Sequence, residues 1–180
     1  GTWAKVFASR VLQKDQGLSD GYDLEDIGVI LGYDQYCSDR VVLGGALSYA
    51  TGSVFSNAPS KDEQSVKSFQ FTTYSTYDFK GPGYLDVMAA VAFNNYDSTR
   101  NIIAGSFLAT STAEFSAWNY GVNLETGYRF SYDKYRIIPL ARFMYSRLRV
   151  DNYTESGAGG LSLSVLNEPI EEGITALGIK

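Results

Sequence analysis

The sequence contains no histidine at all. Histidine is the commonest general base, and it also belongs to Ser-His-Asp triads and to most catalytic zinc sites. The sequence likewise has no G-x-S-x-G elbow, no Walker phosphate loop and no spaced set of carboxylate ligands. We therefore expect no catalytic centre, no metal site and no cofactor in this chain.

Cysteine and long apolar runs are also scarce. The single cysteine, Cys37, excludes an internal disulfide and a cysteine-rich metal site. A membrane-spanning helix needs about 20 predominantly apolar residues, whereas the longest uninterrupted apolar run is residues 87–93. If the protein crosses a membrane, it does so as a β-barrel, because only helices and closed barrels satisfy every backbone group in lipid.

Basic clusters and an export signal are missing as well. The net charge is -5 and no basic block occurs, so we expect neither nucleic acid nor an anionic membrane surface as a partner. There is no initiator methionine and no cationic segment followed by an apolar one and a cleavage site. We expect residues 1–180 to be one domain or part of one, taken from a longer precursor.

Residues 118–130, WNYGVNLETGYRF, alternate without error between an apolar and a polar face. Successive strand side chains lie on opposite faces, so this pattern predicts a two-faced strand. The segment is longer than the usual strand of about 5–6 residues, and aromatic residues stand at both ends of its apolar face. Both features are typical of a transmembrane strand, which has about 9–11 tilted residues and interfacial aromatics.

Two kinds of connection alternate along the chain. Short, turn-forming segments occur at 37–40, 80–83 and 131–134, and long polar segments occur at about 14–26, 53–65, 97–114 and 151–160. Short periplasmic turns and longer external loops are typical of an outer-membrane barrel. We therefore predict an all-β fold, an up-and-down antiparallel transmembrane β-barrel, with strands at about 2–13, 27–36, 41–52, 66–79, 84–96, 115–130, 136–150 and 161–180.

Aromatic residues gather at both ends of the predicted strands. We interpret them as the two interfacial girdles of a membrane barrel, and the alternative is that they belong to the core of a soluble sandwich. The residues assigned to the membrane interface are Tyr33, Tyr77, Phe79, Tyr84, Phe93, Trp118, Tyr128 and Phe130.

Polar residues on the opposite strand faces are candidates for the lining of a lumen, where they would be solvated or paired. The strand that begins at Arg136 is ambiguous, because Phe143 and Tyr145 compete with Met144 and Leu148 for the lipid-facing side. The candidate pore-lining residues are Asp34, Asp86, Asn94, Asn119, Asn123, Glu125, Arg129 and Arg142.

Three segments resemble the translocator barrel of autotransporters, the type V secretion family. They are GVILGYDQYCSDRVVLGGALSYATGSV at 28–54, YGVNLETGYRF at 120–130, and RIIPLARFMYSRLRVDNYTESGAGGLSLSV at 136–165. The resemblance runs over essentially the whole chain. It implies a twelve-stranded barrel with a linker helix through the pore, of which residues 1–180 would be a portion holding about the first eight strands.

The resemblance also implies a function. Such a barrel anchors a passenger domain in the outer membrane of a Gram-negative bacterium and exports it to the cell surface. The implied partners are the outer-membrane bilayer, the protein's own passenger and linker segment in the pore, and the barrel-assembly machinery with its periplasmic chaperones. Family barrels usually end on an aromatic residue, whereas this sequence ends at Ile179-Lys180. The remaining strands, the linker helix and the passenger are therefore expected outside the chain.

Three alternatives stay open at this point. The chain could be a complete small outer-membrane barrel with an adhesive or structural role, or a soluble ligand-binding barrel. Some autotransporters also cut their own passenger inside the pore, using a linker asparagine and acidic lumen residues. Asp86 and Glu125 lie where such acids occur in that subset, and Arg142 stands where a further acid is expected. Ordinary lumen polarity is the other interpretation of these residues.

Overall fold

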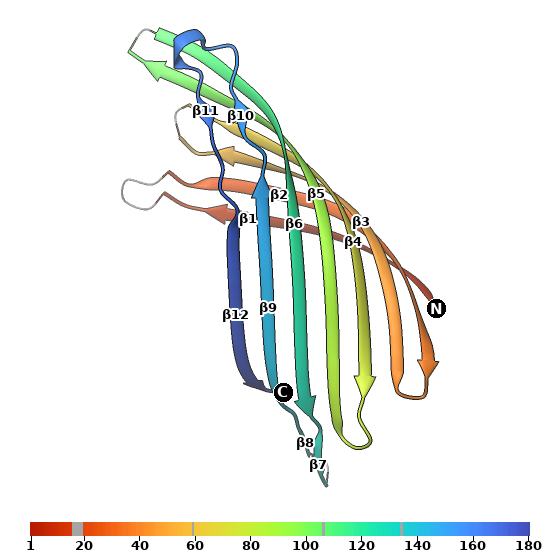
Figure 1. Cartoon of the computed structure of the whole chain (residues 1–180). Coiled ribbons are helices and arrows are strands. Elements are labelled where there is room, and N and C mark those ends of the chain that lie inside the picture. The colour runs from red at the N-terminus through yellow and green to blue at the C-terminus, as the bar shows by residue number, and fades with distance from the viewer. Residues whose placement is uncertain (16–19, 59, 106, 134) are drawn as a thin grey trace.

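The computed structural model describes residues 1–15, 20–58, 60–105, 107–133 and 135–180. One eight-stranded antiparallel sheet dominates it, and each strand pairs with the next long strand in chain order (Figure 1). The predicted all-β, up-and-down arrangement is confirmed. The strands are β1 (Thr2–Gln13), β2 (Tyr22–Ser38), β3 (Val41–Ser56), β4 (Glu63–Asp78), β5 (Gly83–Ala104), β6 (Phe107–Tyr128), β9 (Pro139–Val150) and β12 (Ile170–Ile179).

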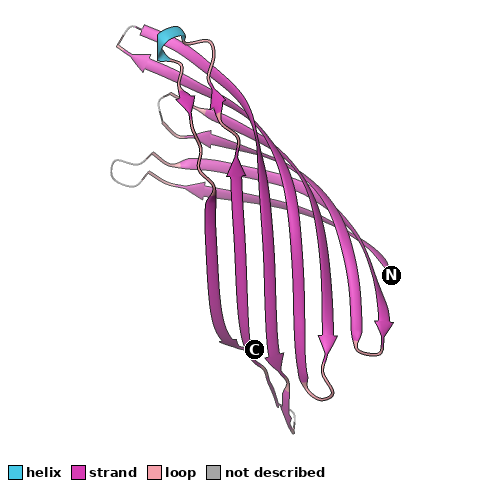
Figure 2. Cartoon of the chain, in the orientation of Figure 1, coloured by secondary structure: helices cyan, strands magenta, loops and turns pink. Residues whose placement is uncertain are grey.

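The sheet is strongly twisted and curved, and it is open. Among the described residues, β1 pairs only with β2 and β12 pairs only with β9. Figure 2 shows strands over most of the chain and short connections between them at one end of the sheet. The molecule is therefore a curved wall with two free edges, as expected for a portion of a barrel.

Four short strands and one 3-10 turn lie at the two ends of this wall. β7 (Phe130–Tyr132) and β8 (Tyr135–Ile137) form a small hairpin beyond the end of β6. The connection from β9 to β12 contains β10 (Tyr153–Thr154), η1 (Gly159–Leu161) and β11 (Ser164–Val165). No helix in the described part of the chain is long and apolar enough to cross a membrane.

Several strands run farther than predicted at their long-loop ends. β2 begins at Tyr22, β3 continues to Ser56, and β5 and β6 pair as far as Ala104 and Phe107. The polar composition of these extensions indicated loops, but ladder hydrogen bonds depend on the backbone and persist beyond the apolar part of a strand. Residues 16–19, 59, 106 and 134, on which parts of the predicted connections fall, lie outside the described residues.

The predicted last strand at 161–180 is wrong in its first part. Leu161 ends η1, and Ser164–Val165 form β11, which pairs with β10 inside the same connection. The strand that joins the large sheet starts only at Ile170, where it pairs with Leu148. The local hairpin therefore takes the residues that the alternation had assigned to the wall.

Cross-strand pairing defines the two faces of the wall, because directly paired residues in an antiparallel sheet lie on the same face. We call the face of Glu125 the inner face and the face of Trp118 the outer face. Trp3 of β1 bonds Tyr74 of β4 across two intervening strands, at 3.1 Å from indole nitrogen to hydroxyl, and both lie on the inner face. Contacts that bridge intervening strands indicate the concave side.

Candidate functional site

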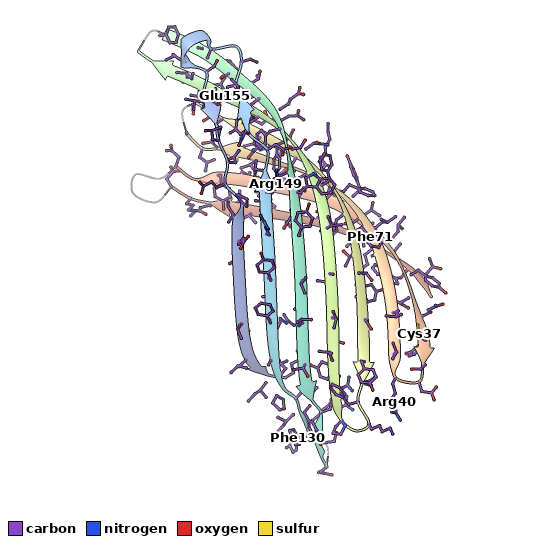
Figure 3. The ribbon with its side chains drawn as sticks, viewed as in Figure 1. Cys37, Arg40, Phe71, Phe130, Arg149 and Glu155 are labelled. Atoms are coloured by element: carbon purple, nitrogen blue, oxygen red, sulfur yellow. The ribbon has the colours of Figure 1, made fainter. Side chains whose placement is uncertain are left out.

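The outer face carries a continuous apolar belt. One cross-strand row runs through Leu31, Leu47, Phe71, Val91 and Tyr120, each paired with the next. Leu31 is 59% exposed and Phe71, labelled in Figure 3, is 47% exposed. An apolar surface that crosses five strands is unfavourable in water, but it is what the lipid-facing side of an outer-membrane barrel requires.

Aromatic rings mark both borders of this belt. Near the short turns, Tyr77 lies 5.3 Å from Phe79 and Tyr128 lies 4.5 Å from Phe130, measured between ring centroids. Toward the long loops, Phe93 lies 5.0 Å from Trp118. Tyr33, Tyr77, Phe93, Trp118 and Tyr128 are on the outer face by their pairing. Their assignment to the membrane interface remains a prediction that this arrangement supports.

The assignment of Tyr84 to the interface is wrong. Tyr84 pairs with Asp78 and Gly127, lies on the inner face, and is only 5% exposed. Its hydroxyl donates a hydrogen bond to Glu125 at 2.8 Å. Proximity to a turn suggested a girdle position, but strand alternation puts residue 84 on the face of Asp86. Tyr84 is therefore a partner of the inner charges.

Glu125 is the centre of the inner polar cluster. Its carboxylate accepts a hydrogen bond from Arg142 Nε at 2.9 Å, a second one from the same guanidinium, and one from Lys180 Nζ at 2.9 Å. Glu125 is only 7% exposed, and a buried carboxylate is tolerated only when it is paired. The cluster therefore links β5, β6 and β9 with the residue that follows β12.

Asp86 lies directly opposite Glu125 in the β5–β6 ladder. It accepts a hydrogen bond from Thr76 at 2.7 Å, and no ion pair to Asp86 occurs among the described residues. One step along β4, the Asp78 carboxylate pairs with Arg129 at 2.6 Å, and the Arg129 guanidinium also lies 4.6 Å from the centre of the Tyr84 ring. These contacts bring Asp86, Glu125, Arg129 and Arg142 into one region of the inner face.

The other candidate pore residues share the inner face but lie elsewhere on it. Asp34 accepts hydrogen bonds from Trp3 at 3.0 Å and from Tyr74 at 3.1 Å. Asn123 has a buried side-chain oxygen with no hydrogen-bond partner among the described residues. The pairing also puts Asn94 and Asn119 on this face. All eight candidates therefore face the concave side, and their lining of a pore remains a prediction.

The sequence analysis did not identify Tyr84 and Lys180 as partners of Glu125. Strand alternation contained the signal for Tyr84, because residues 84 and 86 have the same parity and therefore lie on the same face. Lys180 left no such signal, since its approach to Glu125 depends on how β12 pairs with β9. The pairing also settles the ambiguous strand β9: Phe143 and Tyr145 lie on the outer face opposite Leu124 and Val122, and Met144 and Leu148 lie on the inner face.

The connection between β9 and β12 folds against the inner face at the long-loop end. The Tyr153 ring stacks on Phe115 with centroids 4.2 Å apart, and Phe115 stacks on Tyr96 at 5.0 Å. Glu155, labelled in Figure 3, accepts a hydrogen bond from Arg100 Nε at 3.0 Å and another from the Leu163 amide at 3.1 Å. The Arg100 bond above all lowers the pKa of Glu155 to about 2.

No metal centre emerges within the described ranges, where no group of three or more His, Cys, Asp or Glu side chains could hold an ion. The inner face instead presents paired charges, hydroxyls and small residues. Such a surface can keep a layer of water beside it, and a polypeptide can move along it.

Curated relatives match this chain over most of its length. Outer membrane protein A of Rickettsia conorii is 25% identical over 173 residues, which is 92% of this chain and 9% of the relative. Outer membrane protein B of Rickettsia japonica is 23% identical over 164 residues, 87% of this chain and 10% of the relative. An extracellular serine protease of Serratia marcescens is 26% identical over 159 residues, 87% of this chain and 15% of the relative. The chain thus spans a small fraction of each of these proteins.

Solved structures share the fold. The translocator domain of the autotransporter NalP from Neisseria meningitidis aligns with a TM-score of 0.70 at 13% identity, covering 99% of this chain and 58% of that one. The β domain of the Bordetella autotransporter BrkA aligns with a TM-score of 0.67 at 24% identity, covering 99% of this chain and 68% of that one. The family model described as "Autotransporter beta-domain" matches residues 2–180, and the chain therefore belongs to the autotransporter β-domain family.

Proposed function

We propose that residues 1–180 form part of the wall of an outer-membrane translocator, which anchors a passenger domain and lets it reach the cell surface. The observation that carries this proposal is the division of one curved sheet into an apolar outer belt and a polar inner face. The outer belt holds the wall in lipid, and the inner face borders a hydrated passage.

The inner face suits a passage that does not retain its cargo. Two of its acids are matched by cations, in the contacts of Glu125 with Arg142 and of Asp78 with Arg129, and Asp86 accepts a hydrogen bond from Thr76. Large inner rings lie over glycines instead of standing free, as Tyr74 does over Gly44 and Trp3 does over Gly32. An unfolded passenger therefore meets few unpaired charges and few protruding apolar groups that would bind it.

The free edges indicate what the wall needs in a membrane. Both β1 and β12 leave one side without a strand partner among the described residues. Unpaired backbone groups are costly in lipid, so each edge has to be covered there. Further strands of the same protein are the natural cover. Barrel-assembly machinery and periplasmic chaperones are the partners that would protect the edges until the barrel closes.

A matched pair of substitutions tests the orientation of the wall. Phe71 lies on the outer belt and Thr72 on the inner face of the same strand. An arginine on the lipid-facing side at the bilayer midplane costs about 2–4 kcal/mol. We therefore expect Phe71→Arg to abolish assembly of the full-length protein in the outer membrane, and Thr72→Arg to be tolerated. Equal effects of the two substitutions would contradict the assignment of the faces.

Export itself needs a separate readout. An epitope inserted upstream of residue 1 in the full-length protein should be accessible to antibody on intact cells, and it should become inaccessible in Phe71→Arg. If the barrel assembles but the upstream epitope stays hidden, the alternative of a small barrel without secretion activity is favoured.

We infer a structural role, not a catalytic one, for the inner acids. Glu125 is already engaged by Arg142, Lys180 and Tyr84, which leaves little of its carboxylate available as a base. In the full-length protein, Asp86→Asn should leave passenger release unchanged. A clear loss of release with normal barrel assembly would instead support self-cleavage in the pore.

A further inference from the structure

Two arginines extend from the outer face of β9 beside the aromatic border of the belt. Arg147 pairs with Tyr120 of β6, and Arg149, labelled in Figure 3, pairs with Trp118. Trp118 in turn contacts Phe93 of β5 and stacks on Tyr120. Arg149 is therefore the cross-strand neighbour of a ring that marks the long-loop side of the membrane belt, and Arg147 is the neighbour of Tyr120 in the belt row. The long loops of such a barrel lie outside the cell.

A hollow of about 300 Å³ opens between these arginines and the start of the following connection. Its lining includes Asp151, Asn152 and Asn167. Asn167 is held in place by two hydrogen bonds. Its backbone nitrogen donates to the Asn152 side-chain oxygen at 2.8 Å, and its side-chain nitrogen donates to the Asp151 backbone carbonyl at 3.0 Å. The hollow thus has two basic side chains on one wall and an ordered polar loop on the other.

One of the two arginines at the hollow has no ion-pair partner among the described residues. Arg147 Nε lies 3.4 Å from Glu171 of β12, whereas Arg149 makes no ion pair or hydrogen bond to another side chain in the described part of the molecule. The other outer-face cations differ in this respect: Arg10 pairs with Asp23 at 2.6 Å, and Lys67 lies 4.0 Å from Asp97. The guanidinium without an ion pair therefore lines the same hollow as the Arg147 side chain.

We propose that Arg147 and Arg149 bind a phosphate group of an outer-leaflet lipid. A guanidinium presents a planar fork of donors that matches phosphate oxygens, and interfacial aromatics fix the level at which lipid headgroups lie. The overall charge of -5 argued against an anionic membrane surface, but one phosphate group needs only a local donor, and the Arg149 guanidinium has no ion-pair partner among the described residues. Asp151 and Glu171 offset the formal charge of the two arginines, so the site suits a single phosphate group and not an extended anionic surface. The proposal depends on membrane orientation and not on passenger export.

The test uses the full-length protein in phosphatidylcholine vesicles, with and without lipid A that carries its phosphates. A ligand that binds only the folded state raises the unfolding midpoint. We expect lipid A to raise the midpoint of the heat-dependent gel shift of the unmodified protein, and most of this rise to disappear in R147Q/R149Q. Arg40→Gln is the matched control, since Arg40 is an exposed arginine in the turn between β2 and β3 at the other end of the sheet (Figure 3). It should keep the full rise.

Two further arms identify the source of the anion. Lipid A from which the phosphates have been removed, and inorganic phosphate with phosphatidylcholine alone, should not raise the midpoint. No rise with phosphorylated lipid A, or an undiminished rise in R147Q/R149Q, would overturn the proposal. An equal rise with inorganic phosphate would also overturn it, because the site would then be one for free anions. None of these measurements depends on surface display of the passenger, so they test the lipid site separately from export.

Discussion

The Tyr84 ring lies over Gly127, its direct cross-strand partner on the inner face of the β5–β6 hairpin. A Cβ atom at residue 127 would stand 2.7 Å from ring atom Cε1 of Tyr84, which is closer than real contacts allow. The glycine therefore gives the ring its place against the wall, and from there the hydroxyl reaches Glu125 at 2.8 Å.

This relationship predicts the effect of Gly127→Ala. The added methyl group must displace the Tyr84 ring and weaken its bond to Glu125. Overpacking of this kind costs about 1–3 kcal/mol of unfolding free energy. Gly121→Ala is a matched control on the same face of β6, because the nearest atom to its new Cβ is a carbonyl oxygen at 3.9 Å. Denaturant unfolding of the full-length protein in vesicles should separate the two variants, and equal stabilities would show that the ring adapts without loss.

The pairing at residues 84 and 127 also shows what the sequence could predict. Strict alternation was sufficient for the two faces of residues 118–130, and parity alone could have put Tyr84 on the inner face. The polar strand extensions could not be recognised, since side-chain composition indicates where lipid ends and not where backbone pairing ends. The contact of Lys180 with Glu125 depends on a register set across β9. Ser164 and Val165 pair with β10 in a competing local hairpin that no periodicity distinguished from a wall strand.

Glu125→Gln should destabilise the barrel, because Arg142 and Lys180 would lose the carboxylate that neutralises them. Breaking a fully buried pair costs about 3–5 kcal/mol. Here we expect about 1–3 kcal/mol, since the side chains of Arg142 and Lys180 are 38% and 57% exposed and water screens them. The midpoint of heat-dependent unfolding measures the loss. The charge swap Glu125→Arg with Arg142→Glu should recover part of it, and a swap no better than either single change would argue against a specific pair.

Acid should release the connection between β9 and β12 from the inner face. The pKa of Glu155 is about 2 in the folded protein, against an ordinary value of 4.5, chiefly because Arg100 donates a hydrogen bond to it. A carboxyl whose folded pKa is lowered contributes its full stability above the unfolded value. That stability is lost as the pH falls through about 4.5 toward 2.

Hydrogen exchange at the Leu163 amide, which bonds Glu155 at 3.1 Å, reports this release directly. Protection should fall across that pH window in the unmodified protein after correction for the intrinsic exchange rate. The variant Glu155→Gln should have low protection throughout and no such transition. If both proteins show the same pH profile, a different group controls the loop.

Cysteines introduced one at a time at neighbouring positions of β9 test which face of this strand meets lipid, which the sequence left undecided. Phe143 lies opposite Leu124 on the outer face, and Met144 lies opposite Asn123 on the inner face. In a Cys37→Ser background, a water-soluble maleimide should label Met144→Cys from the hydrated lumen. Phe143→Cys should react only with a lipid-soluble reagent, because a thiolate does not form in hydrocarbon and the polar reagent does not enter it. Unfolding in detergent should make both sites equally reactive, which controls for intrinsic differences. If the polar reagent labels Phe143→Cys in intact outer membranes as readily as Met144→Cys, the lipid would lie elsewhere and the assignment of the inner and outer faces would be wrong.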